Sequence, residues 1–168
     1  MFEIGEKIVF GSEGVFTVIE YTNSPIDKGD PRVFYVLRPL TGAEGNRIIT
    51  PSEGGLTAMR AVIGREEALA LIDKIPEIGI IEVSNERNRR DTYRAVMAEG
   101  RPDSMVSIIK TVRERRVSFA KQKRRLSETD ADFESRAKHC LYSEVSVALD
   151  ISYCDVEGCL ASKFNNEG

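Results

Sequence analysis

The chain has 168 residues, of which 41% are apolar and 30% charged, and its formal net charge is −3. This composition is typical of a folded globular protein and excludes an intrinsically disordered one. No apolar run approaches the ~20 residues that a transmembrane helix needs. The N-terminal residues also lack the cationic start and apolar stretch of a signal peptide, so we expect a cytoplasmic protein.

The first 60 residues predict short β-strands. β-branched and aromatic side chains form runs separated by turns that contain Gly, Asp and Asn. The expected strands cover residues 7–10, 15–21, 33–37 and 47–50, with 58–60 as a candidate last strand. So few short strands cannot form two large sheets. We therefore expect a small Tudor-like or SH3-like antiparallel β-barrel over residues 1–57.

Beyond residue 60 the apolar residues recur at helical spacing. We expect one helix over 66–75, stopped by Pro76, and a second that Ser84 or Asn85 caps and Gly100 ends. A third is expected to start at Asp103 or Ser104 and to bury Phe119. The last two carry apolar stripes over 133–149 and 156–164. The sequence thus predicts an α+β, two-domain protein, with a compact all-helical domain of about five helices at 58–168.

Basic residues are concentrated in the middle of the chain. Residues 85–125 contain thirteen Lys and Arg against five Asp and Glu, a local balance of +8, whereas residues 1–84 and 126–168 carry −5 and −6. A solvated helix face usually mixes both signs, and the fork of arginine suits phosphates. This block therefore indicates a surface for a polyanion, in largely sequence-independent contact. Ten candidates for DNA contact are Arg87, Arg89, Arg90, Arg94, Arg113, Arg116, Lys121, Lys123, Arg124 and Arg125.

The residues that enzymes, metals or cofactors need are not grouped in this sequence. The glycine-bearing turns at 11–14 and 53–55 do not continue into a phosphate loop or a dinucleotide-binding helix. The three cysteines form no CxxC pair, and together with the single histidine they do not have the spacing of a zinc site. These residues are Cys140, Cys154, Cys159 and His139. We expect no catalytic residue, no metal, no cofactor and no small-molecule substrate.

Six segments carry motifs in a defined order: Phe2-x-Ile4-Gly5-Glu6-Lys7-Ile8-Val9-Phe10-Gly11-x-x-Gly14-Val15, then 35–39, 49–51, 66–76, 85–93 and 137–149. Together they resemble the CarD-like transcription regulators, the family that shares its N-terminal module with the transcription-repair coupling factor. The resemblance spans nearly the whole chain. It lies in the order of the motifs rather than in any single one.

This resemblance implies a bacterial, nucleoid-associated transcription regulator. Its N-terminal module would bind the RNA polymerase β subunit by strand pairing along a sheet edge. The candidate edge is the strand formed by Arg47, Ile48, Ile49 and Thr50. Its helical module would contact promoter DNA at the upstream edge of the transcription bubble and modulate the stability of the open complex.

One departure from the family concerns a tryptophan. Characterised members insert this side chain into the minor groove at the bubble edge, and the present chain has no tryptophan. The equivalent position lies near Glu86 or Arg87, or near Ile80-Ile81. Isoleucine can also act as an apolar wedge, whereas Glu86 would repel phosphates.

Two alternatives stay open. The first is a protein-interaction adaptor that does not bind DNA and whose basic helices meet an acidic partner. The second is an RNA-binding or ribosome-associated protein. Single-strand binding usually relies on exposed aromatic side chains, whereas Tyr93 and Phe119 both fit apolar helix faces.

Overall fold

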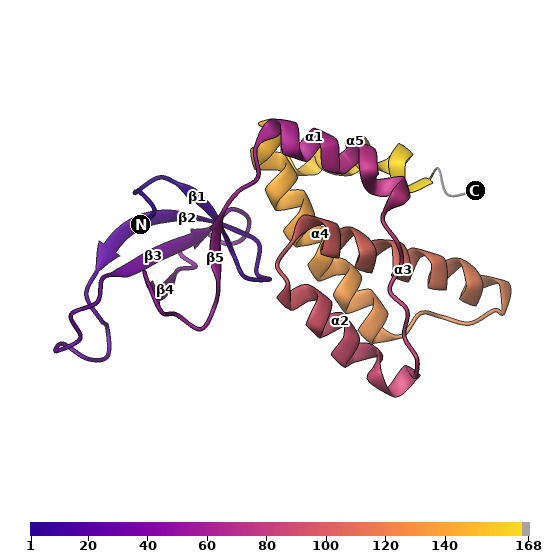
Figure 1. The fold of residues 1–168 in the computed structure, drawn as a ribbon, viewed down its shortest axis with the longest axis horizontal. Coiled ribbons are helices and arrows are strands. Elements are labelled where there is room, and N and C mark those ends of the chain that lie inside the picture. Colours follow the sequence, from indigo (N-terminus) through magenta and orange to yellow (C-terminus); the bar gives the residue numbers. More distant parts are fainter. Residues whose placement is uncertain (166–168) are drawn as a thin grey trace. The chain divides into compact units, whose positions relative to one another are not determined.

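The computed structural model describes residues 1–165 and has five strands followed by five α-helices (Figure 1). Contacts divide the chain into two compact units, Met1–Val62 and Ile63–Gly168. The protein is therefore α+β, as predicted. The first unit extends past residue 57 because the last strand, Met59–Ala61, pairs with the first one, Lys7–Phe10.

The first unit is a single antiparallel sheet. Its strands are β1 (Lys7–Phe10), β2 (Val15–Thr22), β3 (Phe34–Pro39), β4 (Ile48–Pro51) and β5 (Met59–Ala61), in the spatial order β4-β3-β2-β1-β5. Alternate side chains from β1, β2 and β3 build a small core around Ile8, Phe16 and Leu37. Gly11 makes the β1–β2 turn, with φ of +51° and space so tight that a Cβ atom would lie 2.6 Å from Thr57 Cγ2.

The predicted closed barrel is wrong. Closure requires the two edge strands to share a hydrogen-bonded ladder. Within the described residues, β4 pairs with β3 and β5 pairs with β1, so β4 and β5 stay at opposite edges. Both edge strands are short, with four and three residues. The β2–β3 ladder shifts register between Val18 and Glu20, as a β-bulge does.

The second unit is helical. It contains α1 (Arg65–Lys74), α2 (Arg89–Ala98), α3 (Pro102–Lys121), α4 (Glu128–Leu149) and α5 (Tyr153–Asn165), with short 3₁₀ turns η1 (Ile75–Glu77) and η2 (Glu86–Asn88). α3 and α4 pack together at its centre, and α1 and α5 pack near the C-terminal end of α4 (Figure 1). No helix in residues 1–165 is both long and apolar enough to cross a bilayer.

The helix boundaries follow local sequence signals. The Asn85 side chain accepts a hydrogen bond from the Arg87 N–H, and Ser127 accepts one from the Asp130 N–H, as N-caps do. The predicted caps of α3, Asp103 and Ser104, are wrong because α3 begins at Pro102. Proline suits the first helical turn, where its missing N–H has no partner to lose.

A buried lysine joins α3 to the end of α1. The Lys110 side chain is 3% exposed, and its Nζ donates to the carbonyl oxygens of Ile75 (2.8 Å), Pro76 (3.2 Å) and Ile78. These carbonyls lie in and just after the turn η1 that follows α1, and the Ile75 carbonyl also accepts the Ile78 N–H at 3.2 Å. Lys110 therefore satisfies the end of α1 from inside the protein, and it is not part of the outer basic surface.

Candidate nucleic-acid interface

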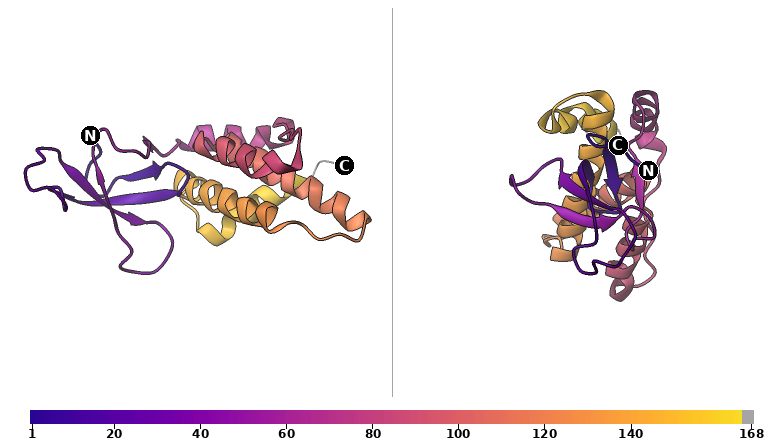
Figure 2. Two further views of the ribbon diagram at one scale, coloured as in Figure 1. Left: turned by 90° about the horizontal axis from the view of Figure 1, so that it is seen from below. Right: turned by 90° about the vertical axis from the view of Figure 1, so that its left-hand side faces the viewer.

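The basic residues at 85–125 lie on η2, α2, α3 and the loop between α3 and α4, apart from Arg101, which directly precedes α3. The last turns of α3 and this loop lie at one end of the helical unit, away from the C-terminal end of α4 (Figures 1 and 2). A weak hydrogen bond of 3.5 Å from Arg90 to Thr129 brings the start of α2 beside the start of α4. The basic block of the sequence is therefore divided between interior contacts and an exposed surface.

A polar network inside this end connects three helices. Asp130 of α4 has no exposed surface, and it accepts hydrogen bonds from Tyr93 Oη (2.7 Å), Arg115 Nε (3.1 Å) and Ser127 Oγ (2.9 Å). Arg115 also bonds to Glu86 through Nη1 at 3.1 Å. The carboxylate of Asp130 is thus fully paired, which a buried charge requires.

Glu86 bridges two arginines rather than repelling DNA. Its carboxylate receives Arg89 Nε and Nη2 at 3.0 and 2.8 Å, in addition to Arg115. The hydrogen bonds from Arg89, and then those from Arg115, lower the pKa of Glu86 to about 2. Burial, reinforced by the hydrogen bond to Asp130, raises the pKa of Tyr93 to about 12. Glu86 therefore stays charged at neutral pH and is neutralised by its neighbours.

Arg89 belongs to this network and not to the outer surface. It is 8% exposed, its Nη1 donates to Tyr93 Oη at 3.1 Å, and its guanidinium lies 5.7 Å from the centroid of the Tyr93 ring. Arg89, predicted as a DNA contact, is thus largely buried and already paired with Glu86 and Tyr93. The helical period of the sequence could have revealed this, because Arg89, Tyr93 and Met97 share one buried face of α2.

Three other predicted contacts at this end face solvent. Arg87, Arg90 and Arg94 are all exposed. Arg94 has a long ion pair of 3.6 Å with Asp91, and both side chains are more than 60% exposed. Such pairs are worth little, so Arg94 is free to exchange Asp91 for a phosphate.

The end of α3 adds a compact group of cations. Lys121, Lys123, Arg124 and Arg125 are exposed. The predicted core position of Phe119 is wrong, since its ring is not part of the apolar core and lies close to two guanidinium groups. The ring centroid is 4.7 Å from Arg115 Cζ and 4.4 Å from Arg124 Cζ. Arg115, absent from the predicted contacts, thereby links the network to the outer surface.

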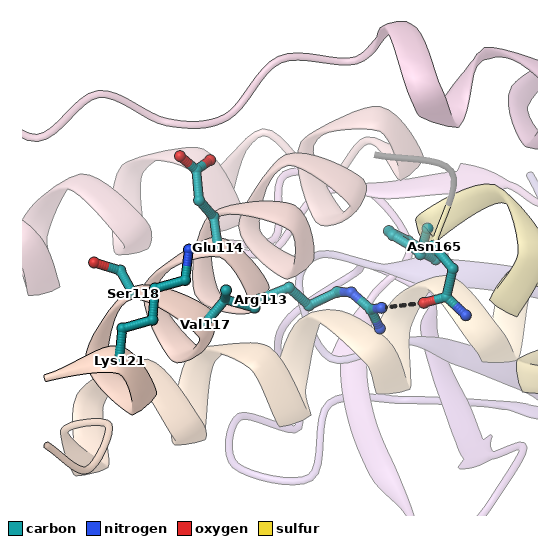
Figure 3. Close-up of a pocket in the computed structure, with 7 residues that line it drawn as sticks. Arg113, Glu114, Val117, Ser118, Lys121 and Asn165 are labelled. Atoms are coloured by element: carbon teal, nitrogen blue, oxygen red, sulfur yellow. Dashed lines mark hydrogen bonds between the residues drawn. The ribbon is translucent and has the colours of Figure 1, made fainter. Parts of the chain in front are cut away.

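Arg113 and Arg116 lie on other faces of α3. Arg116 pairs with Glu134 at 2.8 Å. Arg113 donates to Asn165 Oδ1 at 2.5 Å and lines an open groove of about 500 Å³ between α3 and the end of α5, together with Val117 and Lys121 (Figure 3). Glu114 also lines this groove, so its charge is mixed. These two arginines are less available to a phosphate than those at the loop.

The residues expected to correspond to the tryptophan of CarD-like regulators lie in and before η2. Glu86 and Arg87 form the turn η2, where Glu86 is held by arginines. Ile81 packs on the helical core and donates its N–H to Thr111 Oγ1 at 2.8 Å, whereas Ile80 is 45% exposed. Ile80 is the apolar side chain that this region offers to solvent.

The predicted polymerase-binding strand is an edge of the sheet. β4 pairs with β3 through Ile48↔Leu37, Ile49↔Val36 and Thr50↔Tyr35. Arg47 is exposed, Ile49 is 46% exposed, Ile48 packs on the small core, and Thr50 is buried. In the sheet formed by the described residues, the outer edge of β4 therefore has backbone groups that could pair with an added strand.

Among residues 1–165, no three His, Cys, Asp or Glu side chains gather closely enough to hold a metal ion. Comparison with known proteins adds no assignment: neither a protein-family model nor a curated protein sequence matches this chain at a significant level.

Proposed function

We propose that this chain is a non-enzymatic transcription regulator that binds two partners. Strand β4 of the sheet unit pairs with the RNA polymerase β subunit. This is the role of the Tudor-like module in CarD-like regulators. The exposed cations of the helical unit hold promoter DNA near the upstream edge of the transcription bubble. The protein changes open-complex stability through different affinities for closed and open complexes.

The cationic end of the helical unit is the observation that supports the DNA contact. Arg87, Arg90 and Arg94 come from η2 and α2, and four further exposed cations come from the last residue of α3 and the α3–α4 loop. Arginine binds phosphates through its planar guanidinium group, and several exposed cations on one surface favour a polyanion. In this chain, charge replaces much of what relatives obtain from a tryptophan wedge.

Two weak contacts suffice in this mechanism. Binding at β4 raises the local concentration of the basic surface at the promoter, so neither half needs high affinity alone. The contact with DNA is made to phosphates and sets position rather than sequence preference. A more stable open complex should help promoters that open slowly and hinder promoters that are limited by escape.

A gel-shift titration on fork-junction promoter DNA, with and without polymerase, tests the proposal. We expect a complex that requires or is strongly enhanced by polymerase, and that weakens with salt. The double variant Arg90→Glu/Arg94→Glu should lose it, whereas Lys74→Glu, an exposed cation on α1, should keep it. Retention on polymerase without any DNA contact would instead favour an adaptor with an acidic partner, and binding to single-stranded RNA in preference to the fork would favour the RNA alternative.

A further inference from the structure

The turn that ends α3 has an unusual backbone for its sequence. Lys123 has φ of +54°, in the left-handed region. The Arg124 N–H donates to the Phe119 carbonyl at 2.8 Å and the Lys123 N–H to the Ala120 carbonyl at 3.1 Å. This pair of bonds defines a Schellman motif, and its left-handed position strongly favours glycine. A lysine there makes the fold less stable than it could be.

The helix dipole does not account for this choice. Cations stabilise the last turn of a helix, which explains Lys121. A glycine at 123 would leave Lys121 in place and relieve the backbone. In residues 1–165, the other non-glycine residue with left-handed φ is Asp150, also +54°, which ends α4 with an acidic side chain. A cation is therefore not required to end a helix in this protein, and Lys123 needs another reason.

The residue after Lys123 is held by an aromatic ring. Arg124 Cζ lies 4.4 Å from the Phe119 centroid, where a Schellman motif normally has an apolar contact. Arg115 lies 4.7 Å from the same centroid and is anchored by Asp130 and Glu86. The chain of contacts from Asp130 through Arg115 and Phe119 to Arg124 reduces the freedom of a normally mobile guanidinium. Less entropy is then lost when Arg124 binds an anion.

From these contacts we infer that the α3–α4 turn, residues 121–125, is a preorganised clamp for two or more phosphates of duplex DNA. Lys123 supplies charge at the cost of backbone strain, and Phe119 is a positioning residue for Arg124. The choice of DNA as the polyanion rests on the proposed function. The two guanidinium groups near the Phe119 ring hinder an unpaired base from stacking on it. This favours the backbone of duplex DNA over single strands as the ligand.

The substitution Lys123→Gly tests the clamp through two measurements with opposite expected signs. The unfolding temperature should rise by about 2–4 °C, because the left-handed strain is removed. Affinity for fork-junction DNA should fall roughly three- to tenfold at 0.1 M salt, and the slope of log affinity against log salt should become shallower by about 0.9. The matched control Asp150→Gly should gain stability as well, without losing DNA affinity.

Phe119 is tested without changing any charge. Phe119→Leu, which keeps both Arg115 and Arg124, should weaken DNA binding several-fold. Phe119→Tyr, which keeps an aromatic ring, should bind DNA like the wild type. The measurement is fluorescence anisotropy of labelled duplex DNA titrated with the full chain, alongside thermal unfolding. A loss of affinity that follows a loss of folded protein would mean that Phe119 has a structural role alone.

The outcomes separate this inference from the proposed function. Equal DNA affinity of the Lys123→Gly variant and the wild-type protein overturns the clamp and leaves the proposed function standing. Wild-type protein that binds no DNA, with or without polymerase, overturns the proposed function and the clamp together. If Lys123→Gly lowered the affinity for a polyglutamate chain as much as the affinity for duplex DNA, DNA would be overturned as the ligand of the turn.

Discussion

Arg115 Nε lies 3.1 Å from Oδ2 of Asp130, a carboxylate with no exposed surface. This ion pair joins the last half of α3 to the first turn of α4. Through Glu86, the same arginine also reaches the turn before α2. Arg115 therefore fixes α3 to the start of α4 through the buried Asp130 and to the turn before α2 through Glu86. The geometry of the basic surface, whose exposed cations lie on α2, on these turns and at the end of α3, depends on these contacts.

Substitution of Asp130 tests this dependence. Asp130→Ala removes the buried acceptor of Arg115 Nε, the Tyr93 hydroxyl and Ser127 Oγ, so that Arg115 keeps only the exposed Glu86. We expect a loss of about 3–5 kcal/mol in the free energy of unfolding. Urea denaturation measures it. The control Asp132→Ala removes an acid on the same helix that is 64% exposed, and it should change stability by less than about 0.5 kcal/mol. Similar effects of both substitutions would contradict the assigned role of Asp130.

The low pKa of Glu86 predicts an acid-dependent stability. Because folding lowers this pKa from 4.5 to about 2, its contribution is complete above pH 4.5 and disappears as the pH falls toward 2. Glu86→Gln should therefore flatten the decline in stability across this window. Denaturant midpoints measured from pH 7 to pH 2 check it. Glu82→Gln is the control, and a parallel decline in Glu86→Gln and wild-type protein would argue against the network.

Lys110 supplies a second stability test, within the basic block but away from its surface. Lys110→Met keeps most of the apolar stem and removes the donor to the carbonyls of Ile75 and Pro76. We expect a loss of about 1–3 kcal/mol, since buried carbonyl oxygens lose a charged donor. DNA binding by the folded fraction should not change. Lower DNA affinity with unaltered stability would place Lys110 on the interface instead.

The edge strand β4 is tested through binding to the polymerase. Ile49→Lys places a charge on an exposed position of the strand, and edge charges oppose pairing with another strand. Binding of the full chain to the isolated β-subunit lobe, measured by biolayer interferometry, should weaken at least tenfold. Glu13→Lys, in the β1–β2 turn, should bind like the wild type. Unchanged binding by the Ile49 variant would exclude β4 as the docking strand.

Much of the fold could be predicted from the sequence because its signals are local. Asn85 and the stop at Pro76 mark helix limits, and Val156, Leu160 and Phe164 are buried at the predicted spacing. Barrel closure could not be predicted, because it depends on whether two distant short strands meet. The start of α3 was misplaced because several residues near it can cap a helix.

The site was harder to predict because charge alone does not show where a side chain points. Arg89 and Lys110 belong to the same basic block as Arg90, yet both are buried with partners distant in sequence or across a turn. Phe119 fits an apolar stripe but lies at the end of α3, beyond the core, where Arg115 and Arg124 cover it. Tertiary contacts decided these positions, and Arg115 gained its role through Asp130.

The lifetime of the polymerase open complex tests the central claim most directly. Heparin-challenged open complexes should persist longer or shorter with the wild-type protein than without it, and Arg90→Glu/Arg94→Glu should remove this effect while binding to the β subunit is retained. Ile49→Lys should remove the effect by losing polymerase binding instead. If the Arg90/Arg94 variant changed the open-complex lifetime as much as the wild-type protein does, the proposed DNA contact would be contradicted.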